Sequence, residues 1–263
     1  ANISLPLFYY RRHEENLTSR PLKIINARRT LKKDAITPQL DLVRPIVAVI
    51  PCRRNFDFIQ NLWSQKIGGK TLLAHDIEAC CASTLLDKII VTCDNHDVLE
   101  VMSLYDDSRL TFMPRDERST LRSSNIVDTL HKVMGAADPA GSGIMVLRFV
   151  QTPFVSTGTI EEAVTSLLAN SADSVSAVEE LSGGIYRRNS FGLQKIIEDK
   201  GVLLGSELLY RDTSACIALK SRNIKSGSLL GAIPSGFIVN AAESFFISSM
   251  SDLKIARALD GGS

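Results

Sequence analysis

The stretch from Ile46 to His75 reads IVAVIPCRRNFDFIQNLWSQKIGGKTLLAH, and it combines three signals in a fixed order. Five apolar residues, Ile46 to Ile50, predict a buried strand that ends at Pro51. A long polar loop follows, and Gly68-Gly69-Lys70 then leads into an amphipathic helix. A strand, a loop over its carboxyl end and a helix form the frame on which α/β folds build nucleotide sites.

Strand and helix signals continue to alternate along the chain. Strands are predicted over 46–50, 88–93, 110–113, 144–150, 174–178, 214–219 and 233–239, and helices over 72–83, 97–105, 124–134, 159–169 and 252–259. Ser123 or Ser124 is the expected N-cap of the helix over 124–134. This alternation predicts an α/β fold with a mostly parallel sheet and helices on both faces. Residues 181–212 interrupt it with turn signals and read as a small excursion, a candidate dimerisation element.

The composition is that of an ordinary globular protein, with 263 residues, 44% hydrophobic and 22% charged. No apolar run approaches the length of a transmembrane helix, and the first fifteen residues do not read as a secretory signal. The five cysteines form no C-x-x-C pair, so we expect reduced thiols, no zinc site and a cytoplasmic protein.

Charge is distributed unevenly. Residues 1–45 hold nine basic and four acidic residues, a net charge of +5, whereas the remainder carries −4. We therefore expect a basic N-terminal extension or linker over 1–45, which could bind a protein or an acidic partner. A main domain over 46–259 and a short tail over 260–263 complete the predicted organisation.

Eight stretches together carry a family resemblance. They are VAVIPCR (47–53), GGKTLLAHDIEA (68–79), LLDKIIVTCDN (85–95), SSNIVDTLHKV (123–133), TPFVSTGTIEEAV (152–164), ADSVSAVEE (172–180), YRDTSACIAL (210–219) and SDLKIARAL (251–259). In this order and spacing the chain resembles the CMP-sugar-acid cytidylyltransferases, which include acylneuraminate cytidylyltransferase.

The resemblance implies a Rossmann-like nucleotidyltransferase fold and a homodimer built through the excursion. It also implies a reaction in which the anomeric hydroxyl of a 2-keto sugar acid of the sialic acid type attacks the α-phosphate of CTP. Pyrophosphate leaves, and Mg²⁺ assists. Nucleotide, sugar acid and Mg²⁺ are thus the expected ligands.

The loop after the first strand departs from the family pattern. The family carries P-A-R-G-G-S-K here; Pro51 and Arg53 match, but Arg54-Asn55-Phe56-Asp57 stand where Gly-Gly-Ser-Lys is expected. Glycines allow a close approach of backbone to phosphate, whereas these residues add bulk and a negative charge. A later Lys-Asn pair of the family falls on Leu62-Trp63.

The metal ligands of the family are also altered. The Asp-x-Asp pair before the last helix corresponds to Phe246 and Ser248, neither of which is an anionic ligand for Mg²⁺. Asp94, after the strand over 88–93, is retained and is the remaining candidate for the metal and the nucleotide. Its structural alternative is a cap or turn residue at the end of the strand.

By position in the family motifs, the candidate site residues fall into four groups. They are Arg53 and Lys70 for catalysis; Arg53, Arg54, Asn55, Asp94, Ser124 and Asn125 for CTP; Gln151, Thr152 and Thr213 for the sugar acid; and Asp94 for Mg²⁺. For Lys70 the alternative is a surface lysine at a helix start, and for the loop it is a surface loop without a role in phosphate binding.

Three functions remain open from the sequence. The chain is an active cytidylyltransferase with a divergent site, a non-catalytic homologue that acts as a binding or partner subunit, or another nucleotide-sugar transferase on the same fold. A screen of nucleotides with and without Mg²⁺ would discriminate among them.

Overall fold

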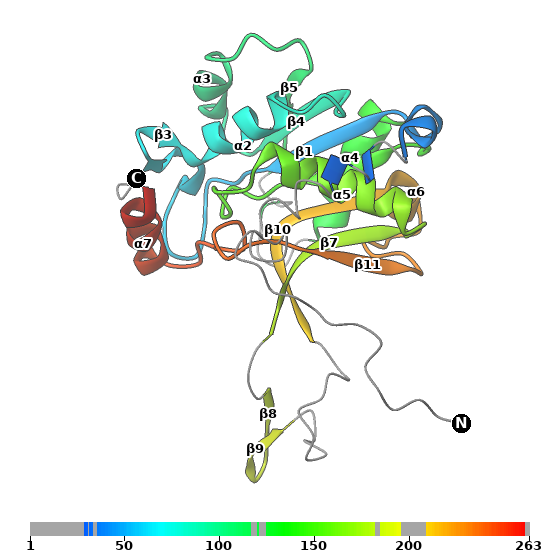
Figure 1. Cartoon of the computed structure of the whole chain (residues 1–263). Coiled ribbons are helices and arrows are strands. Elements are labelled where there is room, and N and C mark those ends of the chain that lie inside the picture. Colours follow the sequence, from blue (N-terminus) through cyan, green and yellow to red (C-terminus); the bar gives the residue numbers. More distant parts are fainter. Residues whose placement is uncertain are drawn as a thin grey trace, which may run out of the picture.

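A seven-stranded sheet with helices on both faces forms the body of the protein in the computed structural model (Figure 1). The structure describes residues 29–30, 32–33, 36–116, 120, 125–181, 185–195 and 209–260. The order of the strands in the sheet is β11-β7-β10-β6-β1-β4-β5. Every neighbouring pair is parallel except the two pairs that β10 makes, with β6 and with β7. The prediction of a mostly parallel α/β sheet is confirmed.

The elements follow the predicted alternation. The strands of the main sheet are β1 (Ile46–Pro51), β4 (Lys88–Cys93), β5 (Leu110–Pro114), β6 (Ile144–Leu147), β7 (Ser174–Glu180), β10 (Tyr210–Lys220) and β11 (Pro234–Ile238). Two hairpins are formed by β2 (Lys66–Ile67) with β3 (Lys70–Thr71), and by β8 (Tyr186–Asn189) with β9 (Gly192–Lys195). The helices are η2 (Asp41–Val43), η3 (Leu62–Ser64), α2 (Leu72–Cys81), α3 (Val98–Met102), α4 (Ile126–Ala137), α5 (Thr157–Ala169), α6 (Ser221–Lys225) and α7 (Met250–Asp260).

Side chains of β1 alternate between two apolar cores, because successive residues of a strand point to opposite faces. Ile46, Ala48 and Ile50 join the core beneath α2, α5 and α7. Val47 and Val49 join the core beneath α4 and α6 on the opposite face. All of these residues are fully buried, which is why the strand reads as a continuous apolar run.

Several predicted boundaries were wrong. The N-cap of α4 is Asn125, whose side chain accepts a hydrogen bond from the Val127 amide, rather than Ser123 or Ser124. The strand predicted over 144–150 ends at Leu147, because Arg148 turns into the core to form an ion pair. The short helix α6 was not predicted.

The described part of the N-terminal segment packs against α5. Arg29 and Lys32 pair with Glu162 at 2.8 and 3.2 Å, and Lys33 pairs with Glu161 at 3.0 Å. Ile36 and Leu40 are buried in the core on the same face of the sheet. Part of the basic charge of residues 1–45 is therefore neutralised by the body of the protein.

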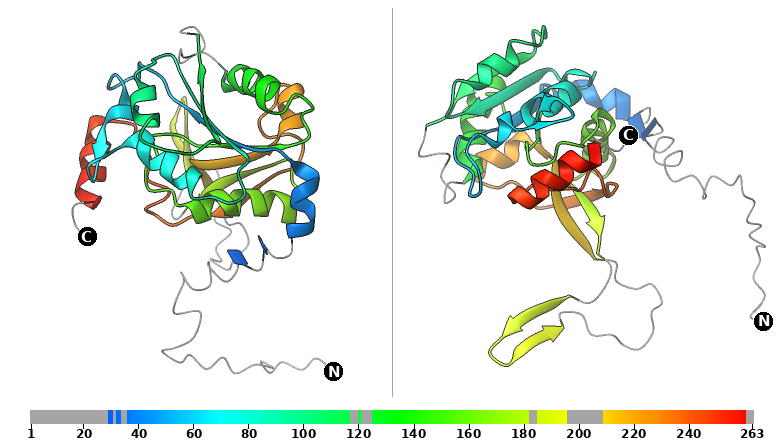
Figure 2. Two further views of the ribbon diagram at one scale, coloured as in Figure 1. Left: turned by 90° about the horizontal axis from the view of Figure 1, so that it is seen from above. Right: turned by 90° about the vertical axis from the view of Figure 1, so that its left-hand side faces the viewer.

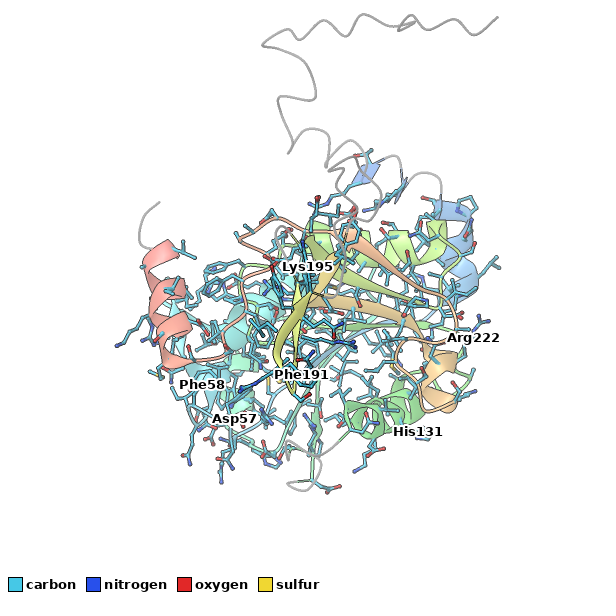
Figure 3. The ribbon with its side chains drawn as sticks, turned by 90° about the horizontal axis from the view of Figure 1, so that it is seen from below. Asp57, Phe58, His131, Phe191, Lys195 and Arg222 are labelled. Atoms are coloured by element: carbon cyan, nitrogen blue, oxygen red, sulfur yellow. The ribbon has the colours of Figure 1, made fainter. Side chains whose placement is uncertain are left out.

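Hairpin β8–β9 lies apart from the body, beyond the ends of β7 and β10 (Figures 1 and 2). Seen from below, the hairpin carries Phe191 and Lys195 toward the viewer (Figure 3). Phe191 is 98% exposed and Leu193 is 74% exposed. The predicted excursion thus contains a two-stranded ribbon with exposed apolar side chains.

No helix among the described residues is both long enough and apolar enough to cross a membrane.

Candidate functional site

One edge of the sheet collects most of the predicted site residues. Parallel strands β1, β4, β5, β6 and β7 end at this edge, and antiparallel β10 begins there. Ligands of open α/β sheets bind in the crevice outside these carboxyl ends. The residues that follow β1, β4 and β6, and the first residues of β10, are therefore the candidates.

The loop after β1 is folded back on itself. The Phe56 amide donates to the Ile59 carbonyl at 3.0 Å, and the Asn61 amide donates to the Arg54 carbonyl at 2.6 Å. Asn55 and Gln60 form a β-bridge between the two arms. Phe56, Phe58 and Ile59 pack against the core. Apolar anchoring and internal hydrogen bonds thus fix this loop as a closed hairpin.

Asp94 ties the closed loop to the end of β4. One carboxylate oxygen accepts the Arg54 amide at 2.6 Å, and the other accepts the Thr120 hydroxyl at 3.1 Å. In this arrangement Asp94 satisfies a backbone donor of the loop that the resemblance assigns to phosphate. The Arg54 amide is consequently engaged within the protein.

Two arginines lie beside this carboxylate. The Arg53 guanidinium stacks over the Phe56 ring, 4.7 Å from its centroid, and donates to the Thr120 carbonyl at 3.4 Å. Arg115 donates to the Cys52 carbonyl at 3.2 Å, and burial lowers the pKa of Arg115. The structure thus brings Arg53, Arg54, Asn55 and Asp94 together.

Leu62 and Trp63, at the positions of the family's Lys-Asn pair, are buried in the core. Within the part of the chain that the structure describes, the Trp63 indole nitrogen has no hydrogen-bond partner. These positions contribute packing, not charge, to the loop.

Lys70 lies in β3 and pairs with Glu78 of α2 at 2.6 Å. Glu78 also accepts the Tyr105 hydroxyl, and its pKa is lowered chiefly by the hydrogen bond from Lys70. Asn125 caps α4, whereas Ser124 lies outside the described residues.

The three predicted sugar contacts differ in their surroundings. Gln151 accepts the Ile247 amide through its carbonyl, at 2.8 Å. Thr152 is fully buried, and its hydroxyl donates to the Phe149 carbonyl. Thr213 lines an open cavity. Of the three, Thr213 is the residue that lines this cavity.

Sequence reasoning missed the buried ion pair between Arg148 and Asp76. Their side chains are 0% and 1% exposed, and the closest nitrogen and oxygen are 2.6 Å apart. Arg148 also donates to the Thr152 carbonyl at 3.0 Å. Burial raises the pKa of Asp76, while Arg148 opposes that shift. The signal available in the sequence was an arginine within an apolar stretch.

The residues present do not fit a magnesium ion. Ser248 donates from its amide and its hydroxyl to Asp252, which lies in the first turn of α7, and Phe246 is an exposed aromatic ring. Both oxygens of Asp94 accept hydrogen bonds. No group of three or more His, Cys, Asp or Glu side chains in the described ranges could hold a metal. Of the three positions at which the family resemblance places metal ligands, Asp94 alone carries a carboxylate, whereas Phe246 and Ser248 do not.

A cavity of about 590 Å³ opens beside Thr213, between the ends of β7 and β10 and the segment before α7. Its lining residues are Glu179, Arg211, Asp212, Thr213, Ser214, Ala241, Ser244, Phe245, Phe246 and Ser248. A register shift in β10 between Asp212 and Ile217 shapes this wall, with Ser214 in the left-handed region at φ 55°. The cavity provides room for a ligand at this edge.

The fold is shared with solved cytidylyltransferases of low sequence identity. CMP:2-keto-3-deoxy-manno-octonic acid synthetase complexed with CTP aligns with a TM-score of 0.62 and 13% identity, over 82% of this chain and 98% of that chain. The 4-diphosphocytidyl-2C-methyl-D-erythritol synthase of Anaerococcus prevotii gives 0.61 and 12%, over 84% and 98%. Another 4-diphosphocytidyl-2C-methyl-D-erythritol synthase gives 0.59 and 14%, over 83% and 99%. At such identities these likenesses establish the fold alone.

No curated protein sequence matches the chain significantly. The family model described as "Cytidylyltransferase" matches residues 48–201, more than half of the chain. This region includes most of β1, the closed loop, Asp94 and the ion pair of Arg148 with Asp76. The chain therefore belongs to the cytidylyltransferase family.

Proposed function

We propose that this chain is a family member that no longer transfers a cytidylyl group and acts instead as a binding or partner subunit. One observation carries the proposal: Asp94, the retained candidate metal ligand, accepts the Arg54 amide at 2.6 Å and holds the loop closed. A single contact thus engages a backbone donor that the reaction would need and ties the Asp94 carboxylate to the loop.

Nucleotidyl transfer makes two physical demands at this edge. Backbone amides and cations must surround the triphosphate, and carboxylates must hold the metal. In this loop the Arg54 and Phe56 amides are engaged within the protein, and Asp57 adds a negative charge. A unit charge misplaced about 4 Å from a phosphate is worth about 4 kcal/mol at an effective dielectric of about 20. The closed loop therefore opposes a bound polyphosphate.

The test combines thermal unfolding with a pyrophosphate assay. CTP is added with and without Mg²⁺, in the presence of eight- and nine-carbon 2-keto sugar acids. We expect no pyrophosphate above background and a change in Tm below about 1 °C. Pyrophosphate release that requires CTP, Mg²⁺ and a sugar acid together would overturn the proposal. Stabilisation by another nucleotide alone would point to a different transferase on this fold.

The second candidate is an active enzyme that uses CTP and Mg²⁺ to activate a sugar acid of the sialic acid type. It is favoured by the two guanidinium groups of Arg53 and Arg115 at the same edge as the cavity beside Thr213. If this candidate holds, Arg53→Met abolishes pyrophosphate release. Arg222→Met, an exposed arginine of α6 beyond the opposite end of β10, serves as the matched control and leaves that release unchanged.

We further propose that the chain is cytoplasmic and forms a homodimer through hairpin β8–β9. All five cysteines are free thiols, which suits a reducing compartment. Phe191 and Leu193 are exposed apolar side chains that association would remove from water. Phe191→Asp with Leu193→Asp should shift the molar mass measured by light scattering from dimer to monomer. Monomeric wild-type protein at micromolar concentration would contradict this part of the proposal.

A further inference from the structure

The cavity beside Thr213 carries a charge that a sugar acid would not favour. Glu179 and Asp212 are acidic, and Arg211 is the only basic residue among the ten that line it. Arg211 and Glu179 form an ion pair across the strand pair β7–β10. The lining therefore holds a neutralised arginine and one further carboxylate, for a net charge of −1.

The remaining polar groups of the cavity are hydroxyls. Thr213 and Ser244 are buried at its wall, and Ser214 and Ser248 lie nearer the surface. The hydroxyls of Thr213, Ser244 and Ser248 donate to oxygens of the protein itself, so they offer lone pairs to the cavity and suit a ligand that donates hydrogen bonds. Hydroxyl groups of a ligand meet this condition, whereas a carboxylate only accepts.

Apolar surface is also present at the cavity. Phe246 is exposed at the opening, and Phe245 is half-buried beside Phe154, with ring centroids 6.3 Å apart. The faces of aromatic rings pack against C–H groups, which a sugar ring presents on its own faces. The volume of about 590 Å³ falls within the range of about 300–1,000 Å³ typical of small-molecule sites. A monosaccharide fits this scale.

We infer that the cavity binds an uncharged sugar, and that the Glu179–Arg211 pair and Asp212 exclude sugar acids. This inference rests on the proposed binding role and deepens it by naming the class of ligand. An uncharged ligand differs from the sugar acid that the family resemblance implies. The Arg211 guanidinium, which could hold a carboxylate, is already occupied by Glu179.

The experiment compares three probes that share one pyranose ring. Glucose is neutral, glucosamine is cationic and glucuronic acid is anionic at pH 7. Each is titrated to about 50 mM, far above a millimolar Kd, into the full chain while amide NMR shifts are recorded. We expect saturable shifts at Thr213 and Ser244 with glucose, and at least tenfold weaker binding of glucuronic acid.

Glu179→Gln releases Arg211 and should strengthen glucuronic acid binding at least tenfold, while glucose binding changes less than about twofold. Glu180→Gln is the matched control, because it removes the same charge from the adjacent residue, which does not line the cavity. It should leave both affinities unchanged. Circular dichroism confirms that each variant folds.

Three results would overturn the inference. They are equal or tighter binding of glucuronic acid by the unaltered chain, no effect of Glu179→Gln on selectivity, and no binding of glucose or glucosamine at all. Tighter binding of glucosamine than of glucose would revise the ligand to a cationic amino sugar and so also contradict it. Turnover of CTP is measured separately, so a failure of the proposed function is distinguished from a failure of sugar binding.

Discussion

The loop after β1 and the cavity at β10 lie at the same edge of the sheet, yet they are opposite in character. The loop turns its amides inward, packs three apolar side chains on the core and is tied to Asp94. The cavity keeps about 590 Å³ open and is lined by hydroxyls, aromatic rings and charges. The loop is thus closed by its own contacts, whereas the cavity has room for a ligand.

This contrast shows that one frame of strands can carry a closed loop and an open cavity at the same edge. Backbone hydrogen bonds of the sheet and two apolar cores hold the strand ends in place whatever the loops contain. Function depends on the loops, because they alone meet the ligand. Family membership therefore determines the fold, whereas the ligands and any reaction depend on the residues in this chain's loops.

The largest expected effect comes from breaking the buried ion pair between Arg148 and Asp76. Arg148→Ala leaves Asp76 buried and unpaired, and should destabilise the protein by about 3–5 kcal/mol in urea unfolding. The double change Arg148→Met with Asp76→Leu removes both charges and should restore most of that stability. If Arg148→Ala is as stable as the unaltered protein, the ion pair does not contribute to the free energy of unfolding.

Reopening the loop tests the contrast directly. Replacing Arg54-Asn55-Phe56-Asp57 by Gly-Gly-Ser-Lys restores the family pattern and removes the bulk and the negative charge. We expect CTP at ten times its Kd to add about 1.4 kcal/mol, which raises Tm by about 3–6 °C. The unaltered chain should show no such rise. If both respond alike to CTP, the closed loop is not what excludes the nucleotide.

Acid should destabilise the two halves of the sheet through two different carboxylates, Asp107 and Asp173. Arg109 lowers the pKa of Asp107 to about 2 beside β5, and Arg222 lowers the pKa of Asp173 to about 2 beside β7. A carboxyl whose pKa falls on folding stabilises the protein above its unfolded pKa, and this contribution is lost as the pH falls toward 2.

Asp107→Asn and Asp173→Asn should therefore each flatten the dependence of unfolding free energy on pH between about 4 and 2. Hydrogen exchange locates the response, which we expect in β4 and β5 for the first variant and in β7 and β11 for the second. If either variant keeps the pH dependence of the unaltered protein, the carboxylate replaced in that variant does not stabilise the fold.

The smallest effect is expected at Lys70. Its pair with Glu78 is exposed, and exposed pairs contribute about 0–1 kcal/mol. Lys70→Met should therefore change the urea midpoint little, and leave sugar binding unaltered at the cavity, which Lys70 does not line. A loss of pyrophosphate release, in a preparation that shows such release, would instead assign Lys70 a catalytic role.

Much of the fold could be predicted because the local signals agree with the tertiary arrangement. The apolar run of β1 and the capped amphipathic helices each fix their own structure. The excursion was recognised by its turn signals, but hairpin β8–β9 within it was not, because exposed strands lack the alternating pattern that marks a buried face.

The sequence by itself determined the order along the chain of the main strands and helices, and the family. It also showed that the glycines and the lysine of the loop are replaced. These features depend only on residue types and their spacing. Only the tertiary structure decided that Asp94 holds this loop closed, that Arg148 meets Asp76 in the core and that Arg211 is neutralised by Glu179. Each of those contacts joins residues on different elements, and their distances are set by how strands and helices pack.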